Sequence, residues 1–143
     1  MFDSHAHYSL SSSSSPIKYP ALDVSVDPLY FSRSHSNLIY AAGYHPLYLP
    51  AITQFQSALD HLDLLIRSKS IQAMGEIGFD SRFIHIDLQS MYFNAQWELA
   101  CFYDLPISIH LVKSTRIYQQ ALSSLPHNDF VIHGFSGHID LAR

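Results

Sequence analysis

Histidines are the residues of this chain that could do chemistry, because 10 of its 143 residues are histidine. His5 and His7 form a His-x-His pair at the end of the first predicted strand. Alternation along a strand directs both side chains to the same side, so the two imidazoles could share one metal ion. The spacing alone is only a hypothesis, since a chain with this many histidines produces such pairs by chance.

Three further candidate ligands lie at the ends of apolar runs: Glu76, His110 and His133. Each run is a predicted strand, and in parallel α/β sheets and barrels the active site lies at the carboxyl ends of the strands. A structural histidine could fall anywhere along a strand. The repeated position at strand ends therefore predicts that these side chains and the His-x-His pair converge on one metal site.

The predicted ligands are imidazole and carboxylate groups without a thiolate, a set that suits zinc, manganese or magnesium. A glutamate between two sets of histidines could bridge two divalent ions. Two ions about 3.5–4 Å apart would activate a water and stabilise the leaving oxygen of a phosphate ester. The ligand pattern therefore fits metal-dependent hydrolysis.

The elements that must position these side chains alternate along the chain. Apolar and β-branched runs predict strands near residues 1–5, 22–26, 38–43, 71–75, 106–110 and 130–133. Apolar residues at spacings of three and four predict helices over 51–68 and 87–104, and a third from Ser114 that Pro126 ends. Strands that alternate with helices predict an α/β fold with a parallel sheet and helices outside it.

Composition limits the classes of protein that this chain can belong to. A hydrophobic content of 48% and a charged content of 14% exclude disorder and predict one folded domain over residues 1–143. Eight Lys and Arg cannot form a broad basic face, so a nucleic acid would have to be gripped locally, for example by metal ions on a phosphate. The single Cys101 and the lack of a membrane-spanning run predict a cytoplasmic protein without a disulfide or a membrane partner.

A series of short motifs resembles the TatD family of metal-dependent hydrolases. In the family's order they are Asp3 with His5-Ala6-His7, Gly43-Tyr44-His45-Pro46, Gly75-Glu76-Ile77-Gly78-Phe79-Asp80, Gln89 with Phe93 and Gln96, Leu105-Pro106 leading to His110, and His133-Gly134-Phe135-Ser136-Gly137. Each motif alone is modest, but six in order cover nearly the whole chain. The chain is thereby identified as similar to this family.

The resemblance implies a TIM barrel with two divalent metal ions that hydrolyses phosphodiesters, commonly as a deoxyribonuclease acting on DNA. The residues that it implies for the metals are His5 and His7 for one ion, His110 and His133 for the other, and Glu76 as the catalytic bridge. It implies His45 and Lys113 on the substrate side. Independently of the resemblance, the aromatic residues Tyr44 and Phe79 are candidates to stack on a base near the site.

Two departures from the family pattern keep other functions open. Val112 stands where many members have an arginine, and the neighbouring Lys113 cannot grip a phosphate through two parallel bonds as arginine does. The chain carries about six of the eight strands of a TIM barrel and ends at Arg143, before an aspartate that the family uses. The first alternative is a truncated, inactive relative that self-associates through its open edge, and the second is a hydrolase of a small ester or amide.

Overall fold

The computed structural model describes residues 3–6, 21–25, 39–83 and 85–133 of the chain, and within these it forms one six-stranded parallel sheet. The strands are β1 (Asp3–Ala6), β2 (Ala21–Ser25), β3 (Ile39–Ala42), β4 (Ala73–Asp80), β5 (Ile107–Val112) and β6 (Phe130–His133). They follow one another in chain order, and each pairs with the next in parallel. The carboxyl ends of all six strands therefore lie at one edge of the sheet.

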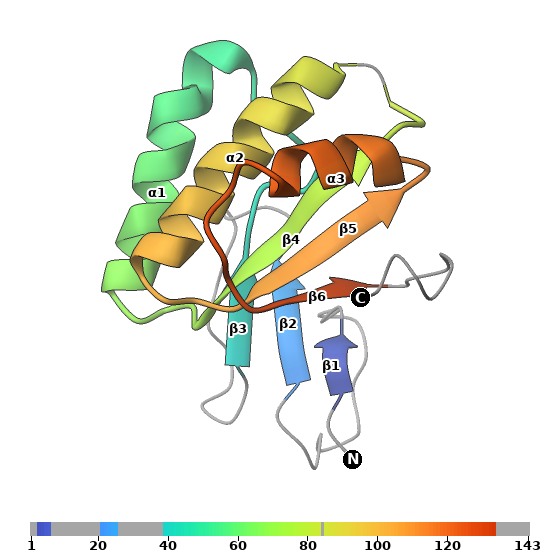
Figure 1. Cartoon of the computed structure of the whole chain (residues 1–143). Helices are drawn as coiled ribbons and strands as arrows, with labels where there is room; N and C mark the ends of the chain where they lie inside the picture. Colours follow the sequence, from blue (N-terminus) through green and yellow to red (C-terminus); the bar gives the residue numbers. More distant parts are fainter. Residues whose placement is uncertain (1–2, 7–20, 26–38, 84, 134–143) are drawn as a thin grey trace, which may run out of the picture.

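Helices cover one face of this sheet (Figure 1). They are the short 3-10 helix η2 (Ile52–Gln54) and the helices α1 (Phe55–Arg67), α2 (Ile86–Phe102) and α3 (Thr115–Leu122). In α1 the buried residues Ala58, Leu62 and Ile66 recur every four positions, which gives the helix one apolar stripe against the core. No helix in the described part of the chain is both long and apolar enough to cross a membrane.

The core lies between the sheet and these helices and is rich in aromatic rings. Phe93 of α2 packs against Phe79 of β4, with ring centroids 4.7 Å apart, and against Trp97, at 5.5 Å. Leu62 of α1 and Ile109 of β5 are completely buried in the same cluster. Each such side chain contributes about 1.5–3 kcal/mol on burial, so the core holds the strand ends in a fixed arrangement.

β4 is longer than the sequence predicted, because it continues to Asp80 and does not end at Gly75. All eight of its residues are buried, including the acidic Glu76 and Asp80, so no exposed residue marks its end. Gly75 has a φ of +139°, and a Cβ there would lie 2.5 Å from the Ser108 carbonyl oxygen of β5. The glycine permits a close approach of the two backbones, and the β4–β5 pairing is irregular between Met74 and Ile77.

The third helix is shorter than predicted, since α3 ends at Leu122, before Pro126. The hydroxyls of Ser123 and Ser124 donate hydrogen bonds to the carbonyls of Gln120 and Ala121, at 2.7 and 2.9 Å. Serine side chains that bond to nearby backbone offer it an alternative to the helix, and the helix ends there without the proline. The other predicted strands and helices agree with the structure to within a few residues.

Candidate metal centre

The register of the sheet brings two candidate positions, His110 and His133, to one level. Gly78 of β4 pairs with His110 of β5, and His110 in turn pairs with His133 of β6. Side chains at paired positions of neighbouring strands lie on the same face. His110 and His133, which are 23 positions apart in the sequence, are therefore neighbours.

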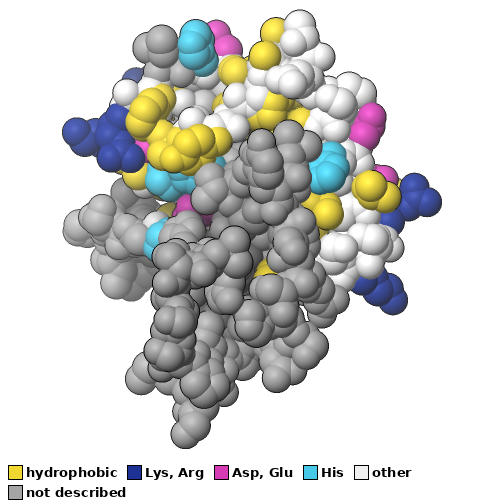
Figure 2. Space-filling model, turned by 180° about the vertical axis from the view of Figure 1, so that it is seen from behind, with side chains coloured by type: hydrophobic (Ala, Val, Ile, Leu, Met, Phe, Trp, Pro, Cys, Tyr) yellow, Lys and Arg dark blue, Asp and Glu magenta, His cyan; other side chains and the backbone are white. Residues whose placement is uncertain are grey.

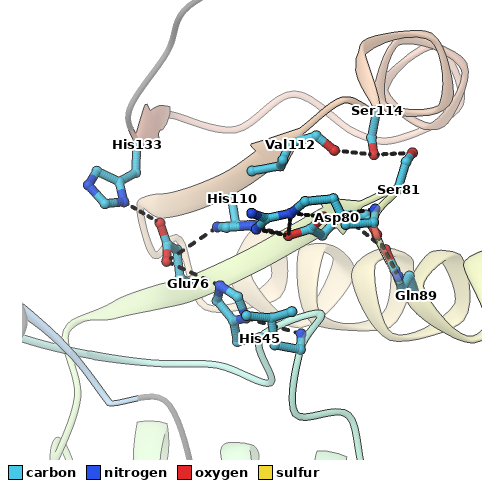
Figure 3. Close-up of polar contacts among 11 residues, drawn as sticks. His45, Glu76, Asp80, Ser81, Gln89, His110, Val112, Ser114 and His133 are labelled. Atoms are coloured by element: carbon cyan, nitrogen blue, oxygen red, sulfur yellow. Dashed lines mark hydrogen bonds and ion pairs between the residues drawn. The ribbon is translucent and has the colours of Figure 1, made fainter. Parts of the chain in front are cut away.

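Glu76 is the centre of the cluster (Figure 3). One carboxylate oxygen, Oε1, lies 2.7 Å from His133 Nδ1. The other, Oε2, lies 3.5 Å from His45 Nε2 and 3.8 Å from His110 Nδ1. Glu76 is only 3% exposed, whereas the His133 side chain is 41% exposed, so the cluster is open on the β6 side. Figure 2 shows histidine and acidic side chains gathered below a group of hydrophobic side chains on this face.

His45 reaches the cluster from the turn after β3. Its ring is buried, and the Leu47 backbone N–H donates a hydrogen bond to its Nδ1 at 3.1 Å. A neutral imidazole has one N–H and one acceptor nitrogen, so this bond leaves Nε2 as the protonated nitrogen, directed at Glu76. In this arrangement His45 is a hydrogen-bond donor toward the centre of the site.

His110 is fixed in the opposite way, by a second carboxylate. Its Nε2 lies 3.1 Å from Asp80 Oδ2, and because a carboxylate accepts, Nε2 carries the proton and Nδ1 faces Glu76. Burial by itself lowers the pKa of His110, but the hydrogen bonds to Glu76 and Asp80 outweigh it and raise that pKa above its ordinary value. In its neutral form, with Nε2 bonded to Asp80, His110 presents Nδ1, the nitrogen that can coordinate an ion, to the cluster.

Asp80 and Arg82 form a support that the sequence analysis did not assign to the site. Arg82 donates to both carboxylate oxygens, through Nε to Oδ1 at 2.9 Å and through Nη2 to Oδ2 at 2.6 Å. The hydrogen bond from Arg82 holds the pKa of the buried Asp80 carboxyl well below its usual range. The available signal was an acid at the end of an apolar run followed two residues later by an arginine.

Two glutamines of α2 fasten the segments that carry these side chains. Gln89 accepts from the Asp80 N–H at 2.9 Å and donates to the Asp80 carbonyl at 3.2 Å. Gln96 does the same for Tyr44, accepting from its N–H at 2.6 Å and donating to its carbonyl at 3.3 Å. Both amides are buried, so each satisfies backbone groups that would otherwise lose their hydrogen bonds to water.

The structure therefore brings together four of the seven residues predicted for the site: His45, Glu76, His110 and His133. Glu76 lies four residues before the end of β4, not at its end as the sequence predicted, because the strand continues past it. His5 lies in β1, near its carboxyl end, and His7 lies outside the described residues. Their roles as ligands stay predictions.

The residues expected to contact the substrate differ in whether they are accessible to it. Lys113 is exposed and directly follows β5, at the same edge of the sheet as His110, and its role stays a prediction. The interpretation of Tyr44 and Phe79 as base-stacking residues is wrong, because Tyr44 is 2% exposed and Phe79 is completely buried. Their rings pack in the core, where no ligand can reach a face.

One oxygen or nitrogen atom from each of His45, Glu76 and His110 lies within 4.8 Å of the other two, a spacing that could hold one ion. This set differs from the predicted one, which pairs His110 with His133. The hydrogen bond from Leu47 argues against His45 as a ligand, because it leaves His45 Nε2 protonated and unable to coordinate. His133 Nδ1 likewise carries a proton toward Glu76 Oε1, so His133 would coordinate only after this hydrogen bond is broken or through its other nitrogen. Imidazole and carboxylate groups suit a divalent cation in either case.

Fold and site together define an α/β protein of the TIM-barrel type with a histidine–carboxylate cluster at the strand ends. The chain belongs to the TatD related DNase family, whose sequence profile matches residues 24–143. It is 31% identical over 114 residues to an uncharacterized metal-dependent hydrolase of Haemophilus influenzae, which covers 75% of this chain and 44% of that protein.

The fold has a solved counterpart. The crystal structure of YjjV, a TatD homolog from Escherichia coli K12, matches with a TM-score of 0.75 and 22% sequence identity. The match covers 99% of this chain and 62% of that one. It confirms the predicted TIM-barrel type of fold, of which the described residues form six parallel strands. The chain spans less than half of the curated relative and less than two thirds of the solved structure.

Proposed function

We propose that this chain is a divalent-metal-dependent hydrolase that cleaves phosphodiester bonds, with DNA as the substrate class. The observation that carries the proposal is the buried carboxylate of Glu76 with three imidazoles around it. A buried carboxylate is costly unless it is paired or coordinates a metal, and a site that only stabilises the fold would not need one side open. Membership in the TatD related DNase family supports the same conclusion.

The residues present fit a divalent ion. Glu76 with His110 and His133 would hold one ion, and Glu76 would bridge to a second held by His5 and His7. When bound, such ions supply the Lewis acidity that activates water and neutralises a phosphate. Magnesium, manganese and zinc all accept this ligand set, and a relative named as a metal-dependent hydrolase supports the assignment.

The chain's own residues would position the substrate. The N–H on His45 Nε2 would donate to a phosphate oxygen beside Glu76, because that nitrogen is the protonated one. Lys113 would add a positive charge from the turn after β5. His110 would keep its orientation through Asp80, which leaves Nδ1 directed at the ion.

The proposal is tested by measuring bound metal and hydrolysis on the same preparations. We expect the chain to bind Mn²⁺ or Zn²⁺ and to hydrolyse a DNA oligonucleotide in a reaction that a chelator stops. Glu76→Gln should abolish hydrolysis and lower metal affinity by at least about 100-fold, since it removes the central charge. Glu98→Gln is the matched control, because Glu98 is an exposed glutamate of α2.

Each contrary result points to another function. Metal binding without hydrolysis would support the inactive relative, and hydrolysis of a nitrophenyl ester but not of DNA would support the small-ester hydrolase. DNA hydrolysis that survives both the chelator and Glu76→Gln would contradict the proposal.

A further inference from the structure

A cavity of about 190 Å³ adjoins the histidine cluster, because Leu47, one of its lining residues, donates a hydrogen bond to the His45 ring at 3.1 Å. One side is formed by Pro46, Leu47 and Leu49, from the turn after β3, and the other by Phe83 and Leu88, from the start of α2 and the segment before it. Most of this lining is apolar. The cavity is a separate feature from the metal centre, because none of the four clustered residues lines it.

Both walls of the cavity start at residues of the metal centre. Pro46 directly follows His45, whose Nε2 lies 3.5 Å from Glu76. Phe83 comes three positions after Asp80, which holds His110. A group attached to a phosphate at the cluster would therefore lie near this cavity.

The Phe83 ring is exposed to solvent, but the side chain of Arg82 packs over it. It is 45% exposed, and the Arg82 guanidinium carbon lies over it, 5.8 Å from the ring centroid. Arg82 is itself held by the carboxylate of Asp80, and Asp80 is held by Gln89. Figure 2 shows hydrophobic side chains next to a group of Lys and Arg side chains on this face. An exposed aromatic ring that is fixed in advance loses little entropy when a ligand stacks on it.

The size and chemistry of the cavity indicate its ligand. An apolar cavity of about 150 Å³ holds one benzene ring, whereas pockets for drug-sized molecules begin at about 300 Å³. A volume between these limits suits a single planar ring system. A phosphodiester that carries such a ring through one sugar is a nucleotide.

We propose that the cavity beside His45 binds the nucleobase of the nucleotide whose phosphate meets the histidine cluster, with Phe83 as the stacking residue. This inference rests on the proposed function and adds the substrate group next to the cleaved bond. Of the described lining residues with polar side chains, Gln89 uses its amide on the Asp80 backbone, which leaves the exposed His85 to meet base edges. Stacking with so few polar contacts would discriminate only weakly between bases.

The test compares two ligands that differ only in the base. Deoxyadenosine 5′-monophosphate and 2-deoxyribose 5-phosphate are titrated into the full chain in Mg²⁺ buffer, with calorimetry as the readout. We expect the nucleotide to bind about tenfold more tightly, as one base–aromatic stack predicts. Phe83→Ala should remove this preference, and Phe83→Tyr, which keeps the ring, should retain it.

Phe102→Ala is the matched control. Phe102 is 79% exposed at the far end of α2, about 25 Å from its first turn along the helix axis. Its variant should keep the full preference for the nucleotide. Equal binding of both ligands to the wild type, no binding of either, or a preference that survives Phe83→Ala would overturn the proposal. If the chain binds the nucleotide more tightly but does not hydrolyse DNA, the assignment of the cavity as a nucleobase site stands and only the proposed activity is refuted.

Discussion

Replacing Asp80 by asparagine tests whether this carboxylate supports the metal centre. Its side chain is completely buried and meets Arg82 through hydrogen bonds of 2.6 and 2.9 Å and His110 at 3.1 Å. Asparagine has nearly the same shape, so Asp80→Asn introduces little steric change. It does place an amide donor where two donors already point, if the amide nitrogen takes the position of Oδ2.

The expected magnitude follows from these contacts. A hydrogen bond to a charged group contributes about 1.5–3 kcal/mol, and Arg82 can regain part of its share from water because half of its side chain is exposed. We therefore expect Asp80→Asn to lower the free energy of unfolding at pH 7 by about 2 kcal/mol. Because His110 loses its fixed orientation, metal affinity should fall by about 10- to 100-fold.

The effect on stability must depend on pH with a definite sign. The pKa of Asp80 is held below its ordinary value of 3.8 in the folded chain. Its contribution is fully present above that value and is lost as the pH falls through the folded pKa. The part of the stability difference that comes from the Asp80 carboxylate itself should therefore be present throughout pH 5 to 7 and be lost on further acidification. The hydrogen bond to Asp80 also raises the pKa of His110, so the difference should grow as the pH falls from 7 to 5 and His110 becomes protonated.

The assay is urea unfolding followed by circular dichroism at several pH values, with Mn²⁺ titrations of the same samples. Asp60→Asn is the control, because Asp60 is an exposed residue of α1 with a hydrogen bond to Gln56. The proposed role of Asp80 is refuted if the free energy of unfolding of Asp80→Asn stays within about 0.5 kcal/mol of the wild-type value, the range of a surface substitution, and the variant binds Mn²⁺ as tightly as the wild type.

Three further predictions concern the supports of the site and the lone thiol. Gly78→Ala should destabilise the chain by more than about 2 kcal/mol in urea unfolding, because Gly78 has a φ of +150° and a Cβ there would collide with the His110 carbonyl; an unchanged midpoint would contradict this. Gln96→Leu should cost about 2–3 kcal/mol in the same assay, since it removes the two hydrogen bonds of Gln96 to the buried backbone N–H and carbonyl of Tyr44; Gln56→Leu, on an exposed position of α1, is the control. Burial raises the pKa of the Cys101 thiol, so iodoacetamide at pH 8 should modify it more slowly in the folded chain than in urea, as followed by mass spectrometry; equal rates would show that the thiol is not shielded.

The pattern of residues in the sequence was sufficient to predict the strands and helices and most of the histidine cluster. Strands and helices follow from the period of apolar residues, because burial of one face is a local requirement that the sequence must meet. Glu76, His110 and His133 could be predicted as neighbours because each ends or follows an apolar run, and parallel strands bring such positions to one edge. Their contacts at 2.7 and 3.8 Å agree with that prediction.

Only the tertiary structure decided which nitrogen each imidazole presents, which aromatic rings are exposed, and what braces the cluster. The orientation of His45 depends on the Leu47 N–H in the turn after β3, and that of His110 on Asp80, 30 positions away on the neighbouring strand. Tyr44 and Phe79 belong to motifs that resemble the TatD family, yet both are buried, whereas Phe83 is exposed and lines a cavity. Periodicity fixes which face of an element is buried. The direction of a hydrogen bond, or the exposure of a single ring, depends on neighbours that are distant in the sequence.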